Sequence, residues 1–101
     1  MAFERLQASL TRGNLWLYVL SELHLGEATP GELKARVEEK HGFSPATITF
    51  YSVIYRLRRE GLVERSTEKF RSAYSVTPKG EAELARALAY FDELKSRLGP
   101  T

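Results

Sequence analysis

Residues 44–66 read SPATITFYSVIYRLRREGLVERS and join an amphipathic segment to a short alternating one. Ser44 and Pro45 are typical of a helix start, with a serine cap before a first-turn proline, and Gly61 marks the end. At about 100° per residue, one apolar stripe contains Phe50, Val53, Ile54 and Leu57. The residues that point away from this stripe are Ser44, Ile48, Ser52, Tyr55 and Arg59. The stretch therefore predicts a helix over 45–60 whose outer side presents hydroxyls, aromatic rings and arginines.

The positive charge of the chain is concentrated around this stretch. Residues 51–80 hold seven basic and three acidic side chains, whereas residues 1–50 hold five and six, and residues 81–101 hold three and four. A basic helix face is often only a solvated surface. Here the helix arginines share a segment with Lys69 and Arg71, which favours a negatively charged partner.

Two further helices are predicted before this stretch. Residues 14–26, NLWLYVLSELHLG, have Asn14 as a candidate N-cap and Gly26 as the stop. Phe3, Leu6 and Leu10 recur upstream at helical spacing and either extend this helix or form a separate turn. In residues 29–42, TPGELKARVEEKHG, a threonine cap, a first-turn proline and a glutamate form a capping box.

A hairpin and a long helix are predicted after it. LVERS (62–66) and SAYSV (72–76) are β-type runs of five residues on either side of TEKFR (67–71), which gives a hairpin with a basic tip. The last helix starts with Thr77 as cap and Pro78 at its first position, and stops at Gly99. Its apolar stripe, longer than a small core can cover, contains Leu84, Leu88, Phe91, Leu94 and Leu98.

This order of elements indicates a winged helix-turn-helix domain, mainly α with a small β-hairpin (α+β). In such a domain the third helix enters the major groove of DNA and the hairpin tip approaches the backbone. We expect residues 1–80 to form the DNA-binding domain, and residues 81–101 to form a C-terminal dimerisation helix continuous with the same single domain.

Several other classes of protein find no support in the composition. With 101 residues and no cysteine, the chain is one domain without disulfides or thiolate metal sites. No apolar run approaches the roughly 20 residues of a membrane helix, and a cytoplasmic location is the default expectation. His24 and His41 lie apart without metal-ligand spacing, and no phosphate loop occurs. We expect no enzyme activity, no metal and no cofactor.

Residues 14–84 resemble the PadR family of winged-helix transcriptional regulators, above all in TFYSVIYRLRREGLVE (49–64) and YSVTPKGEAEL (74–84). The helix matches are Thr49, Phe50, Tyr51, Ile54, Arg56, Leu57, Glu60, Gly61 and Leu62. The wing matches are Arg71, Tyr74, Val76, Thr77, Pro78, Lys79 and Gly80. Two positions depart from the family pattern, because Ser52 replaces the usual proline and Gly31-Glu32-Leu33 lacks an aromatic residue. MarR-like and ArsR-like regulators, which predict nearly the same function, stay open.

The resemblance implies a homodimer, built largely by the last helix with help from the first, that binds double-stranded DNA at a palindromic operator and often represses. The expected interface contains Leu84, Leu88, Phe91, Leu94, Leu98 and Trp16. The alternative is that the last helix folds back onto its own domain. Some relatives bind planar aromatic compounds between subunits, but this sequence identifies no effector.

The candidate DNA contacts are Thr47, Thr49, Tyr51, Ser52, Tyr55, Arg56, Arg59, Lys69 and Arg71. Tyr51 has burial between helix and wing as its alternative, and Arg56 has a salt bridge to Glu60. For Ser44 the capping role is preferred. The predicted function is a sequence-specific DNA-binding regulator, and the alternative is a winged-helix adaptor that binds another protein and no DNA.

Overall fold

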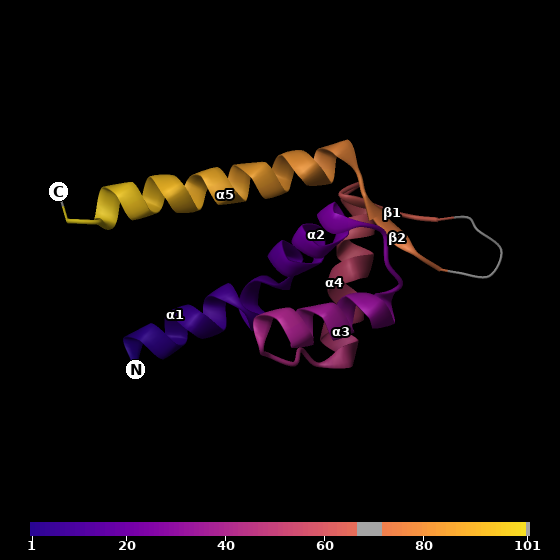
Figure 1. Ribbon diagram of the computed structural model, residues 1–101, viewed down its shortest axis with the longest axis horizontal. Coiled ribbons are helices and arrows are strands. Elements are labelled where there is room, and N and C mark those ends of the chain that lie inside the picture. The colour runs from indigo at the N-terminus through magenta and orange to yellow at the C-terminus, as the bar shows by residue number, and fades with distance from the viewer. Residues whose placement is uncertain (67–71, 101) are drawn as a thin grey trace.

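The computed structural model describes residues 1–66 and 72–100. Its elements are α1 (Ala2–Leu10), the 3-10 turn η1 (Arg12–Asn14), α2 (Leu15–Leu25), α3 (Pro30–His41), α4 (Thr47–Arg59), β1 (Val63–Arg65), β2 (Tyr74–Val76) and α5 (Pro78–Leu98). Helices α2, α3 and α4 form a body with the hairpin at one end (Figure 1). Helix α5 begins beside the hairpin and runs back along α2, and its C-terminal part projects beyond the body on the same side as α1. The predicted α+β winged-helix architecture with a long C-terminal helix is confirmed.

The hydrophobic core lies where α2, α3, α4 and the hairpin meet. The predicted stripe of α4 is fully part of it, because Phe50, Val53, Ile54 and Leu57 are all buried. The hairpin leans on this body as expected: its two strands are antiparallel, and β2 also pairs with the linker between α2 and α3 through two hydrogen bonds that join Tyr74 and Ala28. Each strand has three residues rather than the five expected.

Some of the predicted helix N-caps are confirmed and others are wrong. The capping box at Thr29 is confirmed, with the Glu32 amide donating to the threonine hydroxyl and the Thr29 amide to the Glu32 carboxylate. The cap at Ser44 is wrong: α4 begins at Thr47, and the Ser44 hydroxyl instead donates to the carboxylate of Glu38. Asn14 does occupy the N-cap position of α2, but its side chain makes no capping hydrogen bond.

Helix α1 is separate from α2, which answers the question left open by the apolar spacing near the amino terminus. It buries no residue, and it is held at its last turn instead. The carbonyl oxygens of Gln7, Ser9 and Leu10 accept hydrogen bonds from side chains that follow them in the chain. The donors are the Thr11 hydroxyl at 2.7 Å, the Asn14 amide at 2.6 Å and the Tyr18 hydroxyl at 2.5 Å, respectively.

The start of α5 is bound to the end of α4 in a similar way. The last carbonyls of a helix have no partner inside it. Here the Glu60 carbonyl accepts from Lys79 Nζ at 2.7 Å, and the Gly61 carbonyl accepts from the Thr77 hydroxyl at 2.6 Å. The Leu62 carbonyl accepts from the Thr77 backbone amide at 3.1 Å. We call these contacts, made by residues 77–80 on residues 60–62, the α4–α5 junction.

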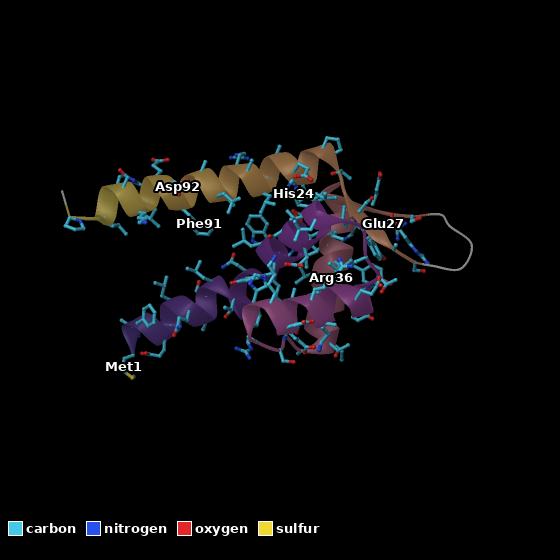
Figure 2. The ribbon with its side chains drawn as sticks, viewed as in Figure 1. Met1, His24, Glu27, Arg36, Phe91 and Asp92 are labelled. Atoms are coloured by element: carbon cyan, nitrogen blue, oxygen red, sulfur yellow. The ribbon has the colours of Figure 1, made fainter. Side chains whose placement is uncertain are left out.

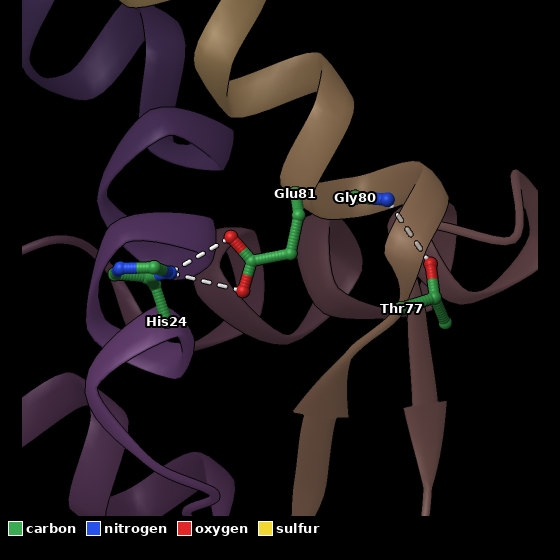
Figure 3. A network of polar contacts seen from close by, with 4 residues as sticks. All are labelled: His24, Thr77, Gly80 and Glu81. Atoms are coloured by element: carbon green, nitrogen blue, oxygen red, sulfur yellow. Dashed lines mark hydrogen bonds and ion pairs between the residues drawn. The ribbon is translucent and has the colours of Figure 1, made fainter.

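Thr77 and Gly80 determine how the first turn of α5 packs at the junction. The Thr77 hydroxyl also accepts from the Gly80 amide at 3.0 Å, so the predicted cap of α5 is confirmed (Figure 3). A β-carbon on Gly80 would lie 2.1 Å from the Leu62 carbonyl oxygen and 2.7 Å from a methyl group of Val76. The first turn of α5 therefore packs against the hairpin at a distance that only glycine permits.

Replacing Gly80 with alanine should lower the free energy of unfolding by about 3 kcal/mol, because the new methyl group meets backbone rather than a flexible side chain. Gly31→Ala is the matched control. An added β-carbon at Gly31 meets nothing within 4 Å, and alanine in the first turn of α3 should stabilise by about 0.5 kcal/mol. Urea unfolding of both variants measures the difference, and equal stabilities would contradict the close contact.

Candidate nucleic-acid interface

The outer side of α4 presents most of the predicted DNA contacts to solvent. Exposed residues on this helix include Thr47, Thr49, Tyr51, Ser52, Tyr55, Arg56 and Arg59. Of the two tyrosines, Tyr51 is the more covered, at 40% exposed against 60% for Tyr55. Lys69 and Arg71, the predicted wing-tip contacts, lie outside the described residues.

Charge is distributed unequally along this surface. Residues 42–55 contain no charged side chain, and the three arginines of α4 all lie in its last turn. Arg56 makes the salt bridge that was its alternative role, with 3.7 Å between its Nε and Glu60 Oε2. Both side chains are about half exposed, and an ion pair of this kind is weak and easily exchanged for another partner. The arginines therefore form a solvated basic end to the helix.

Arg65 joins the same surface from the hairpin, and the sequence had not singled it out. Its Nη2 donates to the Ser72 hydroxyl at 2.6 Å across the base of the wing. Together with Tyr51 and Tyr55 it lines a cleft of about 200 Å³ between α4 and the hairpin. Helical periodicity gives no signal for this residue, because its place follows from the strand register that pairs Arg65 with Tyr74.

The turn between α3 and α4 is stabilised by Glu38. Its carboxylate accepts hydrogen bonds from the Ser44 hydroxyl and from Lys34 Nζ, the latter at 2.9 Å. These bonds hold the pKa of Glu38 below its ordinary value, with the Ser44 bond as the larger cause. Since Ser44 lies just before α4, the Glu38 carboxylate connects α3 to the turn that leads into α4.

A buried carboxylate connects α2 to the end of α3. Glu22 is 2% exposed, and its Oε2 lies 3.3 Å from Lys40 Nζ and 3.5 Å from His41 Nε2. A buried carboxylate needs such nearby positive charge or hydrogen-bond donors. The ring of Tyr18 stacks edge-on against His41, and burial raises the pKa of the Tyr18 phenol. The contacts of His41 with Glu22 and Tyr18 therefore give it a structural role between α2 and α3.

His24 is an exposed residue near the end of α2. Its Nδ1 lies 2.7 and 2.9 Å from the two carboxylate oxygens of Glu81, and this contact joins α2 to the first turn of α5 (Figure 3). Within residues 1–66 and 72–100, no group of three or more histidine, aspartate or glutamate side chains is arranged to hold a metal ion. No helix in the described part of the chain is long and apolar enough to cross a membrane.

The apolar stripe of α5 is fully buried only at Leu84, while Phe91 and Leu94 are partly buried. Leu84 belongs to the core of its own chain, and Trp16 packs partly buried against that core. Further along, Leu88 is 55% exposed and Leu98 is 77% exposed. Phe91 lies on the side of α5 that faces α1 and α2 (Figure 2).

Hollows flank the stripe where α5 diverges from the body. Two of them, of about 310 and 440 Å³, separate α5 from the end of α1 and from α2, and Leu10, Leu17 and Phe91 line both. On α1, Phe3 and Leu6 are also exposed. The two helices that extend from the body therefore carry the main uncovered apolar surface of the described residues.

Several solved structures of transcriptional regulators have a similar fold. No protein-family model and no curated protein matches the chain. Solved structures do match. A transcriptional regulator from Clostridium thermocellum has a TM-score of 0.80 at 21% identity, covering 90% of this chain and 92% of its own. A PadR-like transcription factor from Bacteroides fragilis has a TM-score of 0.77 at 22% identity, covering 93% and 95%.

A PadR family transcriptional regulator from Eggerthella lenta is similar over nearly the whole length. It has a TM-score of 0.76 at 26% identity, covering 98% of this chain and 94% of its own. These likenesses confirm the fold that the motifs in residues 49–64 and 74–84 predicted. The names of these three proteins are those of transcriptional regulators or transcription factors.

Replacing Ser44 with alanine should raise the pKa of Glu38 toward its ordinary value of 4.5, because the larger of the two stabilising hydrogen bonds is removed. A carboxyl whose folded pKa is lowered contributes stability above its unfolded pKa and loses that contribution as pH falls through the folded pKa. Ser44→Ala should therefore reduce the loss of stability below about pH 4.5. Carboxyl NMR titration checks the pKa, with Ser96→Ala on α5 as the control. An unchanged Glu38 titration would contradict the contact.

Proposed function

The chain has the PadR-like winged-helix fold, and from this premise we propose that it is a sequence-specific DNA-binding transcriptional regulator. It acts as a homodimer on a palindromic operator, and it represses by occupying a promoter. The observation that carries the proposal is the uncovered outer side of α4, where hydroxyls and tyrosines lead to a basic last turn. The expected wing contacts of Lys69 and Arg71 are part of the proposal.

The arrangement of α4 suits the major groove of B-DNA. The groove, about 12 Å wide, admits one α-helix, and in winged-helix and related domains the N-terminal part of that helix meets the base edges. Thr47, Thr49 and Ser52 are short hydroxyl donors at that end of α4. Arg56 and Arg59 at the other end suit phosphates, which give affinity and orientation without reading sequence. Arg65, at the base of the wing, supports a further backbone contact.

The proposed dimer uses the surface that a single chain leaves uncovered. Exposed Leu88 and Leu98 on α5 and exposed Phe3 and Leu6 on α1 are apolar, and the free ends of both helices project beyond the winged-helix body on the same side. A second copy of the chain is the partner that covers both through a twofold axis. A twofold dimer places two copies of α4 on equivalent half-sites, which accounts for a palindromic operator.

The α4–α5 junction relates these two surfaces. Because Thr77 and Lys79 bind the carbonyls of residues 60–62, which directly follow α4, the direction of α5 is tied to that of α4. A dimer contact along α5 therefore sets the distance between the two α4 helices. That distance selects the spacing of the half-sites, and the bound dimer obstructs polymerase at a promoter.

Binding of labelled random-sequence duplex DNA across a salt series, followed by selection of the tightest sequences, tests the DNA proposal. The selected sequence should be a palindrome. Arg59→Ala should weaken binding and reduce the slope of log K against log salt concentration by about 0.9 per lost phosphate contact, or about 1.8 for a dimer.

Arg86→Ala is the matched control, because it removes the same charge from an exposed arginine on α5 that pairs with Glu83. It should leave the slope nearly unchanged. Equal losses in the two variants would show that net charge alone matters. Absence of binding even at low salt would contradict DNA binding, and the adaptor function would take its place.

Leu88→Asp tests the dimer, since a charge in the middle of the proposed interface should leave a monomer at micromolar concentration. Sedimentation velocity measures the mass. Leu25→Asp is the control, because Leu25 is also exposed, at 66%, but lies at the end of α2. A dimer that survives Leu88→Asp, or a wild-type monomer, would contradict the assigned interface.

A further inference from the structure

Ile48 is the most exposed large apolar residue of α4, at 83%. At about 100° per residue it lies directly opposite the buried stripe, on a ridge that continues through Ser52 and Tyr55 to Arg59. A single exposed aliphatic side chain is ordinary on a protein surface. What makes this one informative is its position at the front of α4 and the side chains around it.

The segment that contains Ile48 lacks the residues that usually read bases. Residues 42–55 contain no arginine, lysine, asparagine, glutamine, aspartate, glutamate or histidine. Guanine is read mainly by arginine and lysine, adenine by asparagine and glutamine, and cytosine by the acidic residues. The hydroxyls of Thr47, Thr49 and Ser52 are exposed, but a hydroxyl both donates and accepts and so discriminates weakly between base edges.

One base feature remains that an aliphatic side chain matches. In the major groove, thymine alone among the four bases presents a methyl group, and apolar side chains recognise it by direct contact. Resting on the proposed placement of α4 in that groove, we propose that Ile48 is a specificity-determining residue that packs against the 5-methyl group of a thymine in each half-site. Arg59 lies on the same ridge about 16 Å further along the helix axis. It keeps its proposed role as a contact to the DNA phosphates.

Uracil substitution in the selected operator isolates this contact. Replacing thymine by uracil removes the methyl group and keeps every hydrogen-bonding group of the base. Each thymine of one half-site is replaced in turn, and Kd is measured for wild type, Ile48→Ala and Leu25→Ala. Because Ile48 is exposed, Ile48→Ala should fold as the wild type does, which thermal unfolding verifies.

For wild type, one position should show a rise in Kd of about fourfold, the effect of one buried methyl group. The symmetry-related position in the other half-site should behave alike. Ile48→Ala should bind the thymine and uracil operators equally, with an affinity near that of wild type for the uracil form. Leu25→Ala, which removes an exposed aliphatic side chain elsewhere, should keep the fourfold difference.

Two results would overturn the assignment of Ile48 and leave DNA binding intact. In one, wild type selects an operator but is indifferent to every uracil. In the other, Ile48→Ala remains as sensitive to uracil as wild type. If no operator is selected and no duplex binds at any salt concentration, the proposed function fails, and the role of Ile48 fails with it.

Discussion

The contact between Gly80 and the carbonyl of Leu62 is the constraint on which the arrangement of the functional surfaces depends. It allows the first turn of α5 to lie against the start of the hairpin, and it brings Thr77 and Lys79 within hydrogen-bonding distance of the carbonyls of Gly61 and Glu60, which directly follow α4. Since all three elements share these bonds, rotation of any one of them breaks hydrogen bonds of the junction. Helix α4, the hairpin and the first turn of α5 are thus tied together through the junction.

A second set of side-chain contacts, to the carbonyls in the last turn of α1, fixes the orientation of that helix. Its last turn is bound by Thr11, Asn14 and Tyr18, although none of its own side chains is buried. An exposed helix of nine residues gains little stability from its own hydrogen bonds. The apolar side chains of α1 therefore stabilise the helix only when another surface covers them. This is the physical reason for assigning a second copy of the chain to the surface that α1 and α5 leave open.

Sequence periodicity and capping rules predicted the helices, because these signals depend on neighbours within four residues. The stripe of α4 and the caps at Thr29 and Thr77 belong to this class. The errors have a different origin. Ser44 binds Glu38 across a turn, and Arg65 joins the α4 surface through its strand pairing with Tyr74, so both depend on contacts that only the folded chain brings together. The exposed half of α5 was predicted from length alone, since one small core cannot cover so long a stripe.

The distribution of charge along α4 separates affinity from discrimination in the proposed regulator. Its three arginines are confined to the last turn, and the whole chain has a net charge of only +2. Phosphate attraction, which is common to all sequences, is therefore modest. A protein with modest general affinity for DNA depends more on fit at its preferred site. The N-terminal part of α4 carries no charged side chain. In the proposed regulator, fit at the preferred site therefore depends on shape and apolar contact, because a methyl group is recognised only where the two surfaces touch.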